Sequence, residues 1–382
     1  MFASQRRSLH VLRGVKLRRV GGVPTFPIQT EVTLFDRCRR GPEGVRRFIG
    51  AFGHSACIPS ALTITAALSD PAGGYIADQK RTEMLQPPRR GILVGVDGSA
   101  AALGAVRWAA HDAALRDVPL TLVHVVNAPV PGWSQVPAPA GFRQWQEKRA
   151  REFIKSAIKV AEESTGERGP VQIDSKVFYS ATVPTLVGLS KEVEMVVVGY
   201  RGHGGVLVRT FLGSVSSGLV YHAHCPVAVI HDDEPLVTNV ARAPVLVGID
   251  GSPASEAATA IAFDEASRRG VGLMALHAWT DLRVSDLKEF FPNFNWDAHL
   301  SEEEETLAER LAGWHERYPD VGIRRRIEIG EPARPLLEAS ERAQLIVVGS
   351  HGGCGFPGIL LGSVGAAVVN RAKIPVIVAR QS

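Results

Sequence analysis

Glycine and serine residues recur in this chain at a spacing that could bind phosphate. In the second half, Gly349 and Gly352 are followed by nine residues and then by Gly362 and Ser363, a G-x2-G-x9-G-S pattern. Glycines at the first two positions permit positive φ and let a ligand approach with no Cβ in the way. Gly362 and Ser363 should open a helix, whose free N–H groups and dipole favour an anion. The pattern therefore predicts a phosphate-binding loop.

The first half has a matching loop that is one residue longer, formed by Gly199, Gly202, Gly213 and Ser214. An insertion in a surface loop costs little closure entropy, but it could shift the amides that meet the phosphates, which makes the second loop the stronger prediction. Arg201 could add a positive charge to the first site or could simply be solvated. One such loop alone would fit an ordinary turn with a Ser N-cap, whereas two copies favour a binding site.

An aspartate ends the first apolar run of each half: Asp97 in VGVDGS and Asp250 in VGIDGS. Either carboxylate could face a ligand, or it could cap the following helix in an Asx turn, as Asp-Gly-Ser sequences do well. A carboxylate among triphosphate oxygens is repulsive unless a divalent cation intervenes. We therefore expect these aspartates near the adenine or ribose of a nucleotide, or on a bound Mg²⁺.

These motifs belong to an internal duplication. GILVGVDGSAA at Gly91–Ala101 recurs 153 residues later as PVLVGIDGSPA, and MVVVGYRGHGG at Met195–Gly205 recurs 150 residues later as LIVVGSHGGCG. The closing segment FLGSVSSGLVYHAHCPVAVI also returns, as LLGSVGAAVVNRAKIPVIVA. Because opening and closing motifs return in the same order, whole domains were duplicated. We predict a basic segment over 1–83 and nucleotide-binding domains over 88–234 and 242–382.

Each half alternates short apolar runs with helical patterns, as expected for an α/β fold. Such a pattern predicts a doubly wound parallel sheet with right-handed crossovers and helices on both faces. The strand over 171–178 is more polar and edge-like, and the acidic run Glu302–Glu305 should start a helix. Ligands of such folds bind at the carboxyl ends of the strands, which is where the motifs above fall.

Composition favours a soluble, cytoplasmic protein. Of 382 residues, 45% are hydrophobic and 21% charged, and the sequence has no run of the roughly 20 apolar residues that span a bilayer. The four cysteines follow no ligand spacing, which favours a reducing compartment. The net charge of +4 comes from residues 1–83, which hold 13 Lys or Arg against 6 Asp or Glu, so a nucleic-acid partner is not expected for the domains.

The basic segment over 1–83 lacks sustained periodicity and a secretory signal. It could be an arginine-rich arm for an acidic partner, a disordered regulatory extension, or a region upstream of a true start at Met84.

Together, the first-strand Asp-Gly-Ser, the glycine loop and the closing Pro-Val strand resemble the ATP-binding branch of the universal stress protein family, over residues 91–380. The resemblance implies five parallel strands in the order 3-2-1-4-5 in each domain, ATP bound across the ends of strands one and four, and pairing of domains through their last strands. It also implies that Val125 and Ala278, each after a His, touch adenine, although both could be plain core positions.

The residues predicted at the two nucleotides, from the motifs and from this resemblance, fall into equivalent sets. The first set is Gly95, Asp97, Val125, Gly199, Arg201, Gly202, Gly213 and Ser214. The second set is Gly248, Asp250, Ala278, Gly349, His351, Gly352, Gly362 and Ser363. The extra residue in the first loop and the segment 1–83 depart from the family pattern.

No convincing catalytic constellation accompanies these motifs. The chain lacks a Walker A sequence, and its first strands do not end in the Ser-Gly-Gly-x-Asp-Ser loop of ATP pyrophosphatases. His203 and His351 could assist slow hydrolysis or could donate hydrogen bonds to phosphate. We expect a nucleotide-dependent sensor in a stress response, a homodimer with an unknown protein partner. A slow ATP hydrolase and a nucleotide-independent dimerisation scaffold are the alternatives.

Overall fold

The computed structural model describes residues 91–127, 141–165, 169–202, 212–231, 240–278, 295–352 and 361–380. The predicted basic segment 1–83 lies outside these ranges, as do residues 128–140 after the second strand of the first half and 279–294 after the second strand of the second half. The chain separates into two units, 1–74 and 75–382, and both repeats belong to the second.

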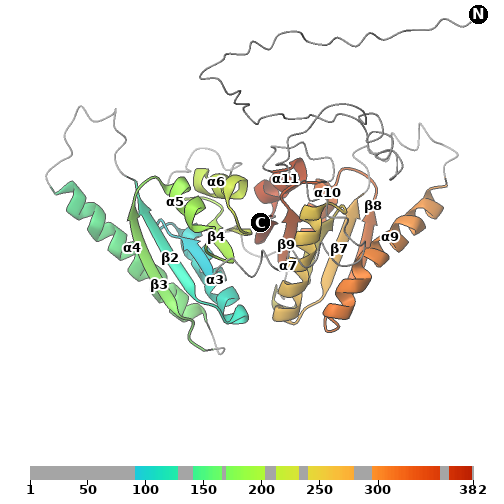
Figure 1. Ribbon diagram of the computed structural model, residues 1–382, viewed down its shortest axis with the longest axis horizontal. Coiled ribbons are helices and arrows are strands. Elements are labelled where there is room, and N and C mark those ends of the chain that lie inside the picture. Colours follow the sequence, from blue (N-terminus) through green and yellow to red (C-terminus); the bar gives the residue numbers. More distant parts are fainter. Residues whose placement is uncertain are drawn as a thin grey trace, which may run out of the picture. The chain divides into compact units, whose positions relative to one another are not determined.

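The two halves repeat one series of elements (Figure 1). The first half contains β1 (Ile92–Gly95), α3 (Ala100–Arg116), β2 (Leu120–Val126), α4 (Phe142–Ser164), β3 (Ile173–Tyr179), α5 (Thr182–Leu189), β4 (Met195–Gly199), α6 (Ser214–His222) and β5 (Val227–Ile230). A short 3-10 helix, η2 (Val240–Arg242), precedes the second half. The second half contains β6 (Val245–Ile249), α7 (Pro253–Arg269), β7 (Leu273–Ala278), α9 (Trp296–Arg317), β8 (Ile323–Glu328), α10 (Ala333–Ser340), β9 (Leu345–Gly349), α11 (Ser363–Arg371) and β10 (Val376–Ala379).

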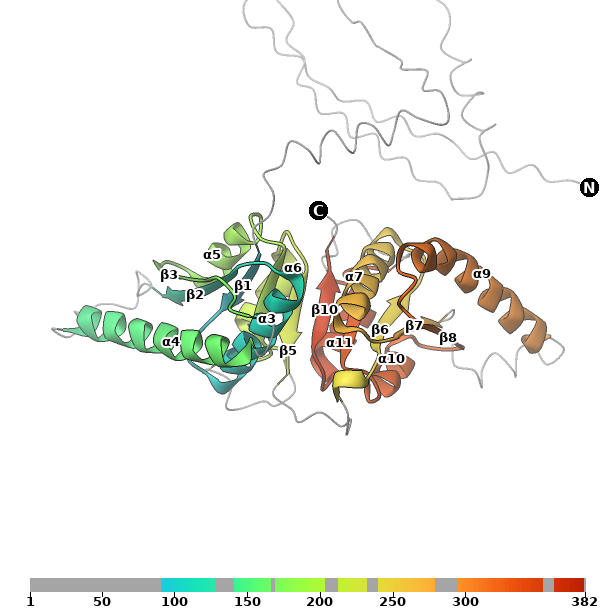
Figure 2. The same ribbon diagram turned by 90° about the horizontal axis from the view of Figure 1, so that it is seen from below.

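The ten described strands form one sheet in the order β3-β2-β1-β4-β5-β10-β9-β6-β7-β8. Neighbouring strands within each half are parallel, as the buried apolar runs predicted. β5 and β10 pair antiparallel at the centre, so the two halves are joined by backbone hydrogen bonds (Figure 2). The strands β3 and β8 form the outer edges, and most β3 side chains are exposed, as expected for its polar sequence.

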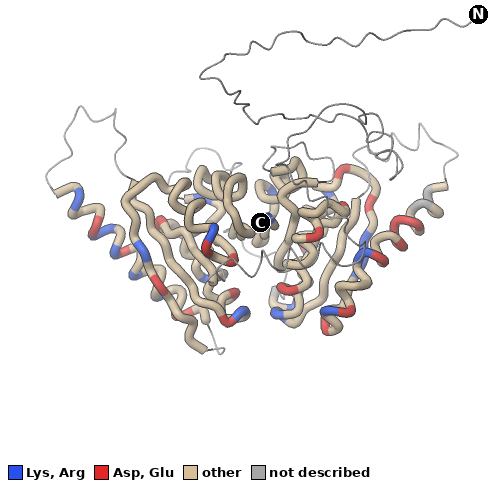
Figure 3. Tube along the Cα trace, viewed as in Figure 1, with Lys and Arg blue, Asp and Glu red and all other residues tan. Residues whose placement is uncertain are grey.

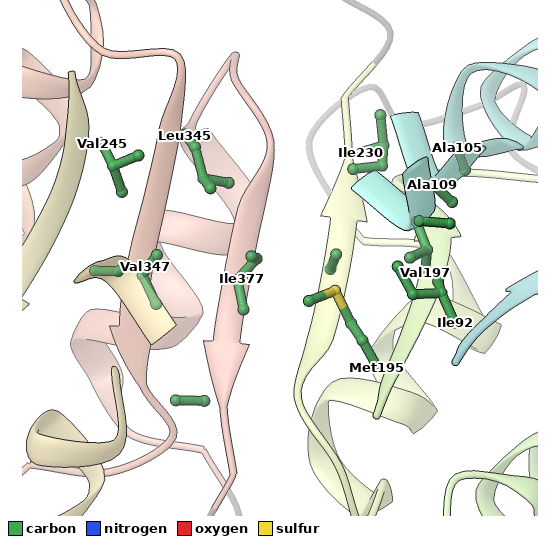
Figure 4. Packing of buried hydrophobic residues seen from close by; sticks show 14 of the residues in the cluster. Ile92, Ala105, Ala109, Met195, Val197, Ile230, Val245, Leu345, Val347 and Ile377 are labelled. Atoms are coloured by element: carbon green, nitrogen blue, oxygen red, sulfur yellow. The ribbon is translucent and has the colours of Figure 1, made fainter. Parts of the chain in front are cut away.

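The inner strands are buried on both faces, and their alternate residues pack into two hydrophobic layers. Ile92 and Val94 of β1 pack in the layer under α3, α4, α7 and α9, and Leu93 packs in the opposite layer under α5, α6, α10 and α11. In the first layer, Ile92 and Val197 of the sheet lie near Ala105 and Ala109 of α3 (Figure 4). Small alanines on the helix allow it to lie close to the sheet that carries the site.

In the part of the chain that the structure describes, the fully buried charged side chains, Asp112 and Glu265, belong to one cluster between α3 and α7. Arg116 binds Asp112 of its own helix at 2.7 Å and also Glu265 of α7. Arg269 of α7 binds Asp112 and Glu265, each at 2.8 Å. Burial, followed by the nearby Asp112 carboxylate, raises the pKa of Glu265. These ion pairs link the two halves on one face of the sheet.

The two long outer helices carry charges of different kinds. α4 contains both basic and acidic residues along its length, whereas α9 is mainly acidic (Figure 3). The acidic run Glu302–Glu305 lies inside α9 rather than at its start, because the helix already begins at Trp296 with Asn295 Oδ1 accepting from the Ala298 N–H. None of the helices in the described ranges is both long and apolar enough to cross a membrane.

Candidate nucleotide site

A pocket of about 540 Å³ lies at the carboxyl ends of β1, β2 and β4 in the first half. Its volume is in the range of small-molecule sites. All the residues predicted for the first site line it: Gly95, Asp97, Val125, Gly199, Arg201, Gly202, Gly213 and Ser214. The parallel topology thus gathers residues from four separate segments at one edge of the sheet.

Each strand-end aspartate uses one carboxylate oxygen in a local turn. Asp97 Oδ1 accepts hydrogen bonds from the N–H of Ser99 at 2.9 Å and from its hydroxyl at 2.5 Å. Asp250 Oδ1 accepts from the N–H of Ser252 at 2.9 Å. The other oxygen, Oδ2, faces the second glycine of the loop in each half, Gly202 or Gly352. The Asx turn and a ligand-facing carboxylate, posed as alternatives from the sequence, are therefore compatible.

The loop glycines are required by close approach and not by positive φ, so the expectation of positive φ at Gly349 and Gly352 is wrong. Positive φ occurs instead at Gly98 (81°) and Gly251 (75°), in the turns after the aspartates. A Cβ on Gly349 would lie 2.9 Å from the backbone of Ala254. A Cβ on Gly352 would lie 2.7 Å from Asp250 Oδ2. Only glycine lets the loop lie this close to the first turn of the neighbouring helix.

The extra residue of the first loop does not alter how the loop is closed. The Gly213 N–H donates to the Tyr200 carbonyl at 3.0 Å, and the Gly362 N–H donates to the Ser350 carbonyl at 2.7 Å. Both glycines are helix N-caps with extended backbone. The extra residue falls within 203–211, which lies outside the described residues together with His203 and with 353–360.

The helices that follow the glycine loops begin differently from the helices that follow β1 and β6. α3 and α7 are capped by Ser99 and Ser252, whose hydroxyls accept from backbone N–H groups of the first turn. α6 and α11 have a glycine N-cap, which offers no side chain, so the Ser N-cap that the alternative interpretation required is not formed. Ser214 and Ser363 occupy the first helical position and are exposed. The first-turn amides of α6 and α11 are thus suited to an external anion.

The sequence profile of the universal stress protein family matches this chain twice, over residues 88–231 and 242–380. The chain belongs to the universal stress protein family. The matches coincide with the two repeats.

Curated relatives carry the same name. This universal stress protein is 54% identical over 292 residues to the universal stress protein Rv2623 of Mycobacterium tuberculosis, covering 76% of this chain and 97% of the relative. It is 52% identical over 300 residues to the universal stress protein Rv2005c of the same species, covering 78% of this chain and 100% of the relative. A solved universal stress protein from Archaeoglobus fulgidus matches with a TM-score of 0.56 at 20% identity, covering 78% of this chain and 100% of that one, which supports the fold.

The ends of the second strands place a His and its apolar neighbour on opposite sides of this universal stress protein's sheet. His124 Nδ1 lies 2.6 Å from the Val96 carbonyl, and His277 Nδ1 lies 2.6 Å from the Ile249 carbonyl. Val125, next to His124, lines the pocket and also packs against the second hydrophobic layer. Ala278 packs against the same layer. The apolar residues are thus partly core, while Val125 also offers a surface to the pocket.

The glycines of the first strands have a packing role. A Cβ on Gly95 would lie 3.3 Å from a methyl group of Val198, and a Cβ on Gly248 would lie 3.2 Å from a methyl group of Leu336. Gly95 nevertheless lines the pocket, so its missing side chain leaves room on that side of the strand.

The residue between the two loop glycines differs between the halves. Arg201 lines the first pocket, and its guanidinium carbon lies 4.8 Å from the centroid of the Tyr200 ring. His351 stands at the equivalent place, with Nδ1 2.8 Å from the Ser350 hydroxyl. The Ser252 hydroxyl donates to the His351 carbonyl at 3.3 Å, which ties the second loop to the turn after Asp250.

The pocket also contains a polar pair that sequence analysis missed. Asn127 Oδ1 accepts from the Thr182 N–H at 3.3 Å and from its hydroxyl at 2.9 Å, and both residues line the pocket. Thr182 begins α5, and the repeat places Pro332, the N-cap of α10, at the equivalent position. Two polar residues 55 positions apart carry no sequence signal, although the Thr/Pro difference between repeats was visible.

The donor set is compatible with Mg²⁺ held mainly by a ligand. Within the described ranges, no cluster of three or more His, Cys, Asp or Glu side chains could hold a metal ion. Asp97 and Asp250 each have Oδ2 on the side of the loop glycines, and Mg²⁺ commonly takes one or two carboxylates with phosphates and water. A Mg²⁺ would therefore arrive with the phosphates.

Proposed function

We propose that this universal stress protein binds ATP with Mg²⁺ in the first-half pocket and in the equivalent place of the second half, and acts as a nucleotide-dependent sensor. One observation carries the proposal: the structure gathers the whole predicted first set of residues around one pocket of suitable size. The resemblance of the glycine loops to the ATP-binding branch of the family supplies the choice of an adenine nucleotide.

The residues suggest how a nucleotide would lie. The amide groups at the start of α6 and the Ser214 hydroxyl would donate to phosphate oxygens, with Gly199 and Gly202 leaving room for them. Val125 would contact the base. Asp97, through Oδ2, would bind the ribose or a Mg²⁺. In the second half, the start of α11 with Ser363, and Ala278 and Asp250, would serve the same purposes.

The sensing step would be a change in the surface offered to a partner when nucleotide orders the glycine loops. A second copy of the chain and an unidentified protein of a stress response in the cytoplasm are the proposed partners. Turnover is not part of the proposal, since hydrolysis needs a positioned base and a site closed to water, and the sequence offers no such constellation.

The test is nucleotide stoichiometry on the full chain. We would extract and quantify bound nucleotide, titrate the stripped protein calorimetrically with ATP and Mg²⁺, and follow phosphate release. Two adenine nucleotides per chain without turnover are expected. ATP at a thousand times its Kd should raise the unfolding free energy of the domain that binds it by about 4 kcal/mol. GTP is the matched control ligand. Absence of binding would favour the dimerisation scaffold, and steady phosphate release would favour the ATP hydrolase.

A further inference from the structure

A residue of the second half binds both ends of the first glycine loop. Asn370 lies near the end of α11, and its Oδ1 accepts from the Leu212 N–H at 3.1 Å. Its carbonyl accepts from the Tyr200 hydroxyl at 3.1 Å. Its Nδ2 donates to the Ala366 carbonyl at 2.7 Å, which fixes the amide so that the oxygen faces Leu212.

These two contacts lie next to the phosphate-binding part of the site. Tyr200 follows Gly199, and Leu212, which lines the pocket, precedes the N-cap Gly213. The Tyr200 carbonyl accepts the closing hydrogen bond of the loop from Gly213. Asn370 therefore fixes the two residues between which the loop leaves and rejoins the sheet edge.

The same corner is packed by a second interaction. Tyr200 stacks on His231, with ring centroids 4.5 Å apart, and His231 Nε2 lies 3.0 Å from the Val369 carbonyl. The end of α11 is thus bound by Tyr200, which follows the carboxyl end of β4, and by His231, which follows the carboxyl end of β5. A shift of α11 would therefore move Tyr200.

The reverse contact, from the first half to the second, is built differently. The repeat places Tyr221 of α6 at the position of Asn370 and Arg380 at the position of His231. Arg380 donates to the carbonyls of Val220 at 3.1 Å, Tyr221 at 2.6 Å and Ala223 at 3.0 Å. In this contact the guanidinium of Arg380, which follows β10, binds the carbonyls at the end of α6. Tyr221 has no side-chain amide, so it cannot offer the amide oxygen that Asn370 offers to the Leu212 N–H.

We propose that Asn370 is a positioning residue for nucleotide binding at the first site, supplied by the other half of the chain. It holds the Leu212 amide, and through it the N-cap Gly213 and the first turn of α6, in the orientation that binds phosphate. The inference rests on the proposed function. First-site affinity then depends on the pairing of the two halves through Asn370, and second-site affinity has no such dependence.

The experiment compares Asn370→Ala with Asn370→Asp in the full chain. Each is made in a background with the second site closed by Gly352→Val and, separately, with the first site closed by Gly202→Val. Calorimetric titration with ATP and Mg²⁺ should show first-site affinity lowered about 2- to 12-fold by Asn370→Ala, the effect expected for one lost hydrogen bond. Second-site affinity should stay within twofold.

Asn370→Asp separates positioning from stability. It keeps an acceptor for Leu212 but loses the donor to Ala366 and puts a negative charge at a helix C-terminus, which should lower the melting temperature without ligand. First-site affinity should nevertheless stay nearer wild type in Asn370→Asp than in Asn370→Ala. A merely structural role predicts the opposite, with affinity following stability.

A readout without ligand completes the test. Hydrogen exchange of the Leu212 amide should become faster in Asn370→Ala and stay protected in Asn370→Asp. Unchanged first-site affinity and unchanged Leu212 exchange in Asn370→Ala would overturn the inference while leaving the proposed function intact. A wild-type chain that binds no nucleotide would overturn both.

Discussion

In the first half, the loop after β4 is anchored on Asn370 of the other half, whereas in the second half it is anchored locally. There the Ser350 hydroxyl binds the side chain of His351, and Ser252 reaches the carbonyl of His351. Yet both loops close with the same glycine-to-carbonyl hydrogen bond and start a helix at a glycine N-cap. The comparison indicates that the repeats share one loop backbone, while the contacts that hold the loop differ. If both loops bind phosphate as proposed, the sites should differ in affinity and regulation more than in ligand class.

The contact between α3 and α7 shows the opposite pattern, because both repeats contribute equivalent residues. Asp112 and Arg116 of α3 correspond to Glu265 and Arg269 of α7, and each arginine binds an acid of both helices. Symmetric ion pairs therefore hold the halves together, and asymmetric contacts surround the sites.

The largest effect is expected from breaking this symmetric cluster with Arg116→Met. Asp112 and Glu265 would lose a partner while their side chains are 0% exposed, which should cost about 3–5 kcal/mol of unfolding free energy. Urea unfolding of the full chain measures this. The control is Arg143→Met, which removes an ion pair with Glu147 whose arginine is 85% exposed and should cost under about 1 kcal/mol. Equal losses in the two variants would contradict the importance of the cluster.

A pH series tests the acid side of the same cluster. Because the pKa of Glu265 is raised by folding, the native state binds more protons than the unfolded state between the ordinary and the raised value. Unfolding free energy should therefore fall as pH rises through that window, and Glu265→Gln should flatten this dependence. Unfolding by urea at several pH values gives the slope, with Glu147→Gln as control. An unchanged slope in Glu265→Gln would show that other groups set it.

The two glycine loops can be compared by matched substitutions. Gly202→Ala would overlap Asp97 Oδ2, and Gly352→Ala would place a Cβ 2.7 Å from Asp250 Oδ2. Each should lower affinity only at its own site, by about 1–3 kcal/mol or roughly 5- to 150-fold. Calorimetric titration resolves the sites, and Gly188→Ala is the control, since a Cβ there meets nothing within 4 Å. If either variant weakened both sites equally, the sites would not be separate.

A smaller effect should come from removing a hydroxyl of the first site that the second half lacks. Thr182→Ala removes the hydroxyl that binds Asn127 at 2.9 Å, and the equivalent residue of the second half is Pro332. First-site affinity should fall about 2- to 12-fold because Asn127 loses a fixed orientation in the pocket. Thr185→Ala is the control, since its hydroxyl binds the Ala181 carbonyl of its own helix. The same loss in both variants would assign the effect to α5 stability.

Sequence predicted the elements, and the gathering of the first-half motif residues at one edge of the sheet, because both depend on local patterns and on the repeat. Strands such as Met195–Gly199 are continuous apolar runs, and parallel topology then places the motifs together. The contacts that hold the first glycine loop were not predictable from the sequence. Asn370 and Leu212 are 158 residues apart, and their hydrogen bond depends on how β5 pairs with β10. Positive φ was the wrong reason for a glycine at position 349. Gly349 is needed because the backbone of Ala254 packs against it, and the spacing of glycines in the sequence does not reveal such a contact.

The smallest expected effect concerns the charge at the first site. Arg201→Gln removes a guanidinium that lines the pocket and lies over Tyr200, which should lower first-site affinity by about 0.5–1 kcal/mol at low salt. Because exposed charges are screened, raising the salt concentration should weaken wild-type binding more than Arg201→Gln binding at this site. The second site, with His351 in the equivalent place, is the internal reference, and Arg143→Gln is the matched control. If the salt dependence of the first site persisted in Arg201→Gln, the attraction would come from the α6 amides, and the two sites would differ only in their supports.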